Sequence, residues 1–169
     1  LYRSGIRLPG LERQLIAALD KNAQHPRTVE LCDAYLATHG DDWEARRIRA
    51  HALLATGQIQ RATEEFEHLV GRGFENDLVI TDLALAYAEA GRTDDRAVSL
   101  YKRAAQICPR LDALYRALGC AYTKRGNVQE AIAQFRVALR TSKECAGRLI
   151  EQCQALVEED SGRVLLRWF

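Results

Sequence analysis

The chain has 169 residues, with 24 lysines and arginines against 23 aspartates and glutamates, so its formal net charge is +1. This length is enough for one domain with a sizeable core, and the near-zero charge argues against nucleic acid or an anionic membrane as the partner. No apolar run approaches the roughly 18 residues that a membrane-spanning helix needs, so we expect no membrane insertion.

Residues 9–42 are expected to form two helices. Pro9 and Pro26 suit the first turn of a helix, where the missing amide N–H is not needed. Residues 1–8 would form an N-terminal flank. The apolar faces of the two helices are marked by Leu15, Ile16, Leu19, Thr28, Cys32 and Tyr35.

Residues 43–76 show a clearer pair of helical patterns. Gly57 separates them and suits a left-handed residue just past a helix end. Arg46 and Arg49 occupy places where apolar residues are expected. The remaining pattern consists of Ala50, Leu53, Ala62 and Phe66.

Two further pairs follow, over residues 77–111 and 112–145. Pro109 is expected to stop the second helix of the first pair, because proline cannot continue a helix. The second pair is the best preserved. It reads Tyr115-x2-Leu118-Gly119-x2-Tyr122, then Ala131-x3-Phe135.

Residues 146–160 are expected to form a capping helix with a polar outer side, as the end of a repeat array requires. Residues 161–169 end in Val164–Phe169, which is too apolar for a solvated tail. This tail either begins another helix or docks on a neighbouring surface. Because the sequence contains no methionine, we expect it to be part of a longer protein.

The landmarks recur at a fixed period. Gly57, Gly91 and Gly126 follow one another after 34 and 35 residues. A small residue and an aromatic follow each glycine. The small residue lets two helices approach closely, and the aromatic four residues later lies on the same helical face. The recurring sets are Ala62, Ala97 and Ala131; Phe66, Tyr101 and Phe135; and Leu69, Ala104 and Ala138.

This pattern resembles the tetratricopeptide repeat, a helix–turn–helix unit of about 34 residues. The resemblance implies an all-α fold in which stacked helix–turn–helix repeats form a right-handed superhelix, or α-solenoid. Lys143 stands where the family has a terminal proline. The implied division is a degenerate repeat over 9–42 and three repeats over 43–76, 77–111 and 112–145.

The resemblance also implies a concave groove, lined by the first helix of each pair, that receives a peptide or helix of a partner protein. Arginine occupies three of the four fifth places of these helices. Its planar fork matches carboxylates, which favours an acidic partner segment. The alternative is that these arginines are ordinary solvated helix residues. The predicted groove residues are Arg13, Arg47, His51, Leu78, Leu85, Arg116, Cys120 and Lys124.

The histidines, paired aspartates and cysteines of the sequence argue against catalysis. The four histidines form no i,i+4 pair and no HExxH motif, so we expect no metal site and no cofactor. The adjacent aspartates at 41–42 and 94–95 lie beside expected helix starts, where they would act as caps. The five cysteines are an odd number without a CxxC pair. They favour reduced core thiols and a cytoplasmic location over a disulfide framework.

The sequence therefore predicts a non-enzymatic scaffold for protein–protein interaction. Two alternatives stay open. The apolar tail could make the chain a self-assembly module and hence a homo-oligomer, or the chain could be the regulatory part of a larger enzyme.

Overall fold

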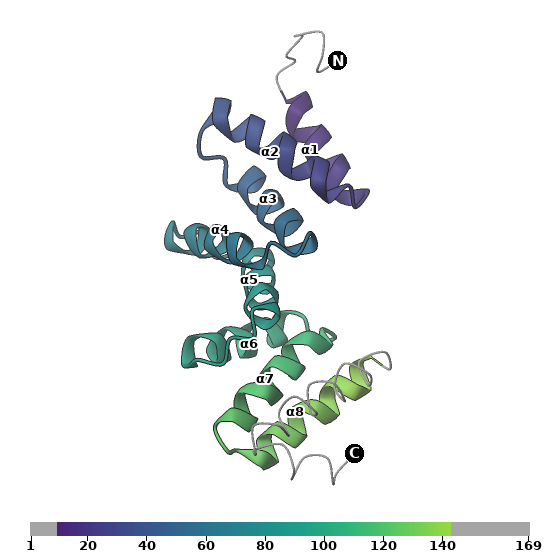
Figure 1. Ribbon diagram of the computed structural model, residues 1–169, viewed down its shortest axis with the longest axis vertical. Helices are drawn as coiled ribbons and strands as arrows, with labels where there is room; N and C mark the ends of the chain where they lie inside the picture. Colours follow the sequence, from purple (N-terminus) through teal and green to yellow (C-terminus); the bar gives the residue numbers. More distant parts are fainter. Residues whose placement is uncertain (1–9, 143–169) are drawn as a thin grey trace. The chain divides into compact units, whose positions relative to one another are not determined.

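The computed structural model describes residues 10–142. Every regular element in this range is an α-helix (Figure 1), which confirms the predicted all-α fold. No helix among the described residues is long and apolar enough to cross a membrane. The predicted flank, the capping helix and the apolar tail lie outside these residues, as do Pro9 and Lys143. The helices are α1 (Leu11–Lys21), α2 (His25–His39), α3 (Trp43–Ala55), α4 (Ile59–Gly71), α5 (Asp77–Glu89), α6 (Asp95–Ile107), α7 (Asp112–Lys124) and α8 (Val128–Thr141).

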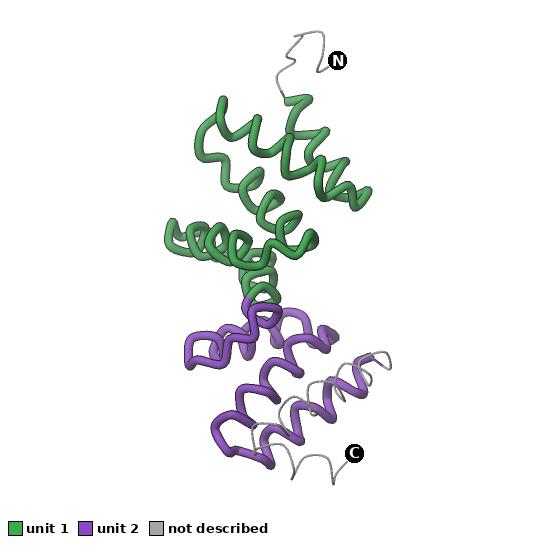
Figure 2. Tube along the Cα trace, viewed as in Figure 1, with its two compact units in different colours: residues 1–86 green, residues 87–169 purple. Residues whose placement is uncertain are grey.

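The chain divides into two compact units, residues 1–86 and 87–169, and the boundary falls inside α5 (Figure 2). In unit 1, α1 contacts α2 and α3, α2 contacts α3, and α3 contacts α4. In unit 2, α6 contacts α7 and α7 contacts α8. The contacting helices named here are mostly neighbours in the sequence, as helix–turn–helix repeats require.

One turn geometry recurs along the chain. Gly57, Gly91 and Gly126 all have left-handed backbone angles, with φ of 78°, 65° and 76°. In each turn the next amide N–H donates to the carbonyl oxygen five residues earlier. These bonds measure 2.9 Å from Gln58 to Leu53, 3.0 Å from Arg92 to Tyr87 and 2.9 Å from Asn127 to Tyr122. This is the hydrogen bond that closes a Schellman helix end, so the role expected for the recurring glycine is confirmed.

The same turn occurs between α1 and α2, but with alanine at its left-handed position. Ala23 has φ of 53°, and the amide of Gln24 donates to the Leu19 carbonyl oxygen at 3.0 Å. Ala23 precedes Gly57 by 34 residues, which is the repeat period. The repeating turn therefore extends into residues 9–42, although the glycine does not.

The recurring small and aromatic residues form the core. Ala62, Ala97 and Ala131 are fully buried, and so are the aromatic rings of Phe66, Tyr101 and Phe135. The core of α1, α2 and α3 gathers Ile16, Leu31, Cys32, Tyr35, Ala45 and Ile48. Burial raises the pKa of the Cys32 thiol to about 12, so this cysteine is a protonated core residue, as predicted for the cysteines generally.

The ion pairs of Arg46 and Arg49 explain why two positions that are usually apolar in the repeat are basic here. Arg46 bonds to Asp41 and to Glu65, with Nη1 2.8 Å from Glu65 Oε2. Arg49 bonds to Asp33 at 2.8 Å and also contacts Glu65. The two arginines therefore connect α3 to α4, to α2 and to the turn between α2 and α3 through paired charges instead of apolar contact.

In unit 2, α7 and α8 approach each other closely at Gly119. Gly119 faces the ring of Phe135, and a Cβ atom at position 119 would lie 2.6 Å from Cδ1 and Cζ of that ring. Carbon atoms pack at about 3.5–4.0 Å. Glycine is therefore the residue that this helix contact requires.

Replacing Gly119 with alanine should lower the free energy of unfolding by about 1–3 kcal/mol, because the added methyl group overpacks the Phe135 ring. Gly71→Ala is the matched control, since position 71 is helical and has no neighbouring atom within 4 Å of an added Cβ. The control should stabilise the chain by about 0.5–1 kcal/mol. Urea unfolding measures both, and equal effects would contradict the assigned contact.

Replacing Ala23 with glycine should raise the free energy of unfolding by up to about 1 kcal/mol. The left-handed conformation costs alanine about 1–2 kcal/mol, which exceeds the extra unfolded-state entropy of glycine, about 0.4–1 kcal/mol. Gly57→Ala makes the reverse change in the equivalent turn and should be destabilising. A destabilised Ala23→Gly variant in thermal unfolding would show that this turn is not left-handed.

Candidate partner-binding site

The predicted groove residues all lie on the first helices of the pairs. Five belong to unit 1 and three to unit 2, and the two groups are described separately. They are Arg13 on α1, Arg47 and His51 on α3, Leu78 and Leu85 on α5, and Arg116, Cys120 and Lys124 on α7.

In unit 1, both predicted arginines already have acidic neighbours. Arg13 contacts Glu44, and its Nε lies 3.4 Å from Asp42 Oδ2. Arg47 Nη1 lies 3.6 Å from Asp82 Oδ2, and both of these side chains are largely buried. The two guanidinium groups are therefore balanced by carboxylates of their own chain.

The apolar members of unit 1 differ in exposure. Leu78 is 60% exposed, whereas Leu85 is partly buried. A separate hollow of about 180 Å³ lies between α1 and α3. Its walls combine apolar side chains with the ion pair between Arg13 and Glu44. The lining residues are Arg13, Gln14, Ile16, Ala17, Glu44, Ala45 and Ile48.

His51 has neighbours that sequence analysis did not connect with it. Its Nδ1 lies 3.0 Å from Asp20 Oδ1. The ring of His25 meets the His51 ring edge to face, with centroids 5.9 Å apart. A sequence motif does not reveal Asp20 and His25 as neighbours of His51. His51 lies 26 positions after His25, and the whole of α2 comes before it.

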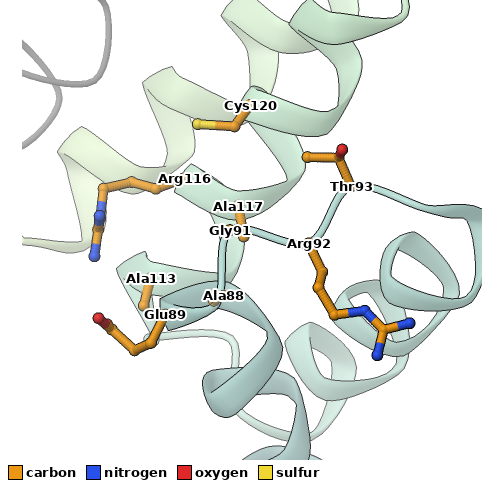
Figure 3. Close-up of a pocket in the computed structure, with 9 residues that line it drawn as sticks. All are labelled: Ala88, Glu89, Gly91, Arg92, Thr93, Ala113, Arg116, Ala117 and Cys120. Carbon is orange, nitrogen blue, oxygen red and sulfur yellow. The ribbon is translucent and has the colours of Figure 1, made fainter. Parts of the chain in front are cut away.

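In unit 2, Arg116 and Cys120 are brought together at one hollow of about 230 Å³ (Figure 3). The hollow exists because Ala88, Ala113 and Ala117 have short side chains and Gly91 has none. Lys124 is exposed at the end of α7. The full lining is Ala88, Glu89, Gly91, Arg92, Thr93, Ala113, Arg116, Ala117 and Cys120.

The Arg116 side chain is fixed within this wall. It is only 9% exposed, and its Nε lies 3.2 Å from Oδ2 of Asp112, one helical turn earlier. Figure 3 shows its guanidinium group on the same side of the hollow as the Glu89 carboxylate. The hollow therefore presents charges of both signs at its edge and apolar surface within.

No protein-family model matches this sequence, and no match is found among curated proteins. Solved structures do resemble it. The MamA structure designated MSR-1 C2 is 24% identical and gives a TM-score of 0.71, covering 92% of this chain and 89% of its own. The MamA structure designated AMB-1 C2221 is 23% identical, also with a TM-score of 0.71, over 93% and 92% of the two chains.

A third similar structure is TTC0263, described as a thermophilic TPR protein in Thermus thermophilus. It is 23% identical and gives a TM-score of 0.55 over 88% of this chain and 83% of its own. The chain has the tetratricopeptide-repeat fold. Identities at this level establish the fold and nothing further about activity.

In this tetratricopeptide-repeat chain, the turn between α5 and α6 forms one wall of the hollow. Its conformation is held by several interactions of Arg92 and Asp94. The Arg92 guanidinium lies 3.9 Å from the centre of the Tyr87 ring, and its Nε donates to Asp94 at 2.9 Å. The Tyr101 hydroxyl donates to the Arg92 carbonyl oxygen at 2.8 Å.

Asp94 also caps α6. Its carboxylate accepts a hydrogen bond from the amide of Ala97 at 3.0 Å. This bond, followed by that from Arg92, lowers the pKa of Asp94 below its ordinary value of 3.8. The prediction that aspartates 94–95 act as a helix cap is therefore confirmed for Asp94, and Asp42 caps α3 in the same way.

Replacing Asp94 with alanine should lower the free energy of unfolding by about 1 kcal/mol at neutral pH, because α6 loses its cap. Asp94→Asn keeps a capping oxygen and removes only the charge. Since the folded pKa is lowered, the charge stabilises the chain above pH 3.8, and this stabilisation is lost as the pH falls through the folded pKa.

The difference in the free energy of unfolding between the wild type and Asp94→Asn should therefore shrink as the pH falls below 3.8. Urea unfolding at a series of pH values measures it. A difference that widened as the pH fell would contradict this assignment.

Proposed function

We propose that the chain is a non-catalytic scaffold that holds a segment of a partner protein against the first helices of its repeats. The observation that carries this proposal is the hollow of unit 2, where two predicted groove residues, Arg116 and Cys120, share one concave surface.

The size of the hollow favours a side chain as its occupant. Pockets for small molecules and cofactors measure about 300–1,000 Å³ and enclose most of the ligand. The hollow of unit 2 is smaller, at about 230 Å³, and it is partly open to solvent. It therefore suits one apolar side chain of a bound peptide better than a complete small ligand.

The charges at the rim favour a partner segment that also carries carboxylates, but they contribute little net affinity. Arg13, Arg47 and Arg116 each face an acidic residue of the same chain. A carboxylate of the partner would largely replace one of these acidic residues in its contact with the arginine. Ion pairs near the surface contribute about 0–1 kcal/mol, whereas burying a leucine side chain contributes about 1.5–3 kcal/mol. The apolar side chain should thus supply affinity, and the arginines should supply specificity.

Peptides selected from a random displayed library on the full chain should carry an apolar residue flanked by acidic ones. Ala117→Phe fills the hollow and should weaken their binding at least tenfold, because the apolar side chain loses its site. Ala133→Phe adds the same ring at an exposed position of α8 and should leave the affinity within about twofold. Fluorescence anisotropy measures the affinities, and circular dichroism checks the fold.

The contribution of charge is separated with Arg116→Gln, compared with Arg136→Gln at an exposed position of α8. Only the first should reduce the salt dependence of peptide binding. Glutamine is preferable to glutamate at position 116, because a second carboxylate would face Asp112. Peptides bound equally well by Ala117→Phe and by the wild type would show that the hollow is not the binding site.

A further inference from the structure

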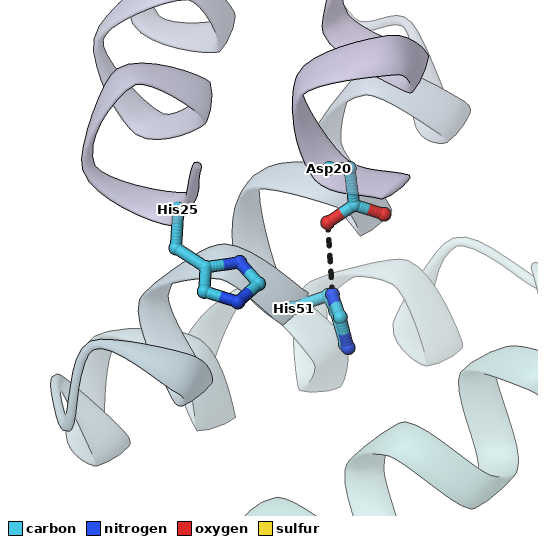
Figure 4. Close-up of side chains that lie close together, drawn as sticks. All are labelled: Asp20, His25 and His51. Atoms are coloured by element: carbon cyan, nitrogen blue, oxygen red, sulfur yellow. Dashed lines mark hydrogen bonds and ion pairs between the residues drawn. The ribbon is translucent and has the colours of Figure 1, made fainter. Parts of the chain in front are cut away.

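Three potential metal ligands converge in unit 1. Asp20 lies near the end of α1, His25 begins α2, and His51 lies on α3. Each offers one ligand atom, and these atoms all lie within 4.8 Å of one another. Figure 4 shows the Asp20 carboxylate and the His25 ring both directed toward His51.

Local backbone structure brings Asp20 and His25 together. The left-handed residue Ala23 reverses the chain within three residues, and its amide donates to the Asp20 carbonyl oxygen at 2.9 Å. The repeat turn thus holds the end of α1 beside the start of α2. His51 joins them because α3 packs against both helices.

The hydrogen bonds of the protein satisfy only part of this cluster. His51 Nδ1 and Asp20 Oδ1 form one bond of 3.0 Å. Nδ1 of His25 is buried and has no hydrogen-bond partner. A buried polar atom without a partner costs about 1–3 kcal/mol, so such atoms call for an explanation, which includes an unseen ion.

We propose that Asp20, His25 and His51 bind a divalent transition-metal ion of the Zn²⁺ class. Two imidazoles and one carboxylate are a donor set that zinc and its neighbours accept, whereas Mg²⁺ and Ca²⁺ prefer oxygen ligands alone. Tetrahedral zinc with bonds of about 2.0–2.1 Å places its ligand atoms about 3.3 Å apart. In the structure one pair of ligand atoms is 3.0 Å apart and all three lie within 4.8 Å of one another, so metal binding requires the side chains to move to that spacing.

The surrounding charge favours a cation. Asp82 on α5 interacts electrostatically with both His51 and Asp20, so a second carboxylate lies near two of the three ligands. Arg47 offsets part of this charge through its contact with Asp82 at 3.6 Å. The fourth coordination position is left to water or to a donor from outside the chain.

Bound metal would join α1, α2 and α3 of unit 1. Because the three ligands converge only in the folded chain, metal binding would stabilise it. This site departs from the sequence analysis, which expected no metal because no two histidines lie at a motif spacing. Its three ligands are residues of unit 1, whereas the hollow of the proposed peptide site is lined by residues of unit 2.

Isothermal titration of the untagged full chain with ZnSO₄ tests the site. We expect saturable binding of one equivalent and a rise in melting temperature. His25→Gln and His51→Gln should each weaken Zn²⁺ binding at least tenfold. Removing a residue that only hydrogen-bonds to a metal ligand already lowers metal affinity about 10–100-fold, and removing the ligand itself should cost no less. His39→Gln changes another histidine of α2, which contacts Glu12 at 3.9 Å, and should leave binding unchanged.

Titration with Co²⁺ tests whether any of the five cysteines is a ligand. Coordination by two histidines and one aspartate should give visible d–d absorption without the thiolate-to-cobalt charge-transfer band. A thiolate band at the first equivalent of Co²⁺ would overturn the proposal. So would a Zn²⁺ affinity of both histidine variants equal to that of the wild type, or the absence of saturable Zn²⁺ binding in the wild type.

Discussion

The contact between a residue without a side chain and an aromatic ring determines how α7 and α8 pack. Gly119 leaves room for Phe135, and a Cβ atom would not fit between them. Fully buried alanines and aromatic rings recur at the repeat period in the preceding helices. Cys120, also on α7, packs against the core cluster that includes Phe135 and lines the hollow as well. One residue of α7 therefore belongs both to the core packing and to the candidate site.

Unit 1 replaces part of this apolar packing with charge. Arg46 and Arg49 both reach Glu65 of α4, Arg46 also pairs with Asp41, and Arg49 also pairs with Asp33. Partly buried ion pairs add little to stability compared with apolar side chains, but removing one partner leaves an uncompensated charge. Loss of Glu65 alone would leave both arginines with one carboxylate fewer. These ion pairs account for a repeat that keeps its fold while departing from the apolar pattern.

The sequence was sufficient for the helices and for the turns marked by glycine, because periodic burial and left-handed residues leave local signals. It was insufficient for three features. Ala23 adopts the conformation of the recurring glycine, but alanine gives no signal of it. The acidic partner of Arg47 is Asp82, 35 residues away. The cluster around His51 joins three helices. Each of these depends on packing between segments, which no short motif encodes. Of the predicted groove, only Arg116 and Cys120 are seen to share one hollow, and the groove as a whole stays a prediction.

His51 belongs both to the predicted groove and to the proposed metal cluster, and this has a thermodynamic consequence. A metal held by three protein ligands keeps one coordination position open. If a carboxylate or imidazole of a bound segment took that position, metal and segment would each raise the affinity for the other by the same factor, since binding linkage is reciprocal. The predicted groove arginines cannot provide such coupling, because carboxylates of the chain already neutralise them. A bound cation would thus give unit 1 a positive centre that an acidic partner could reach without displacing a resident acid.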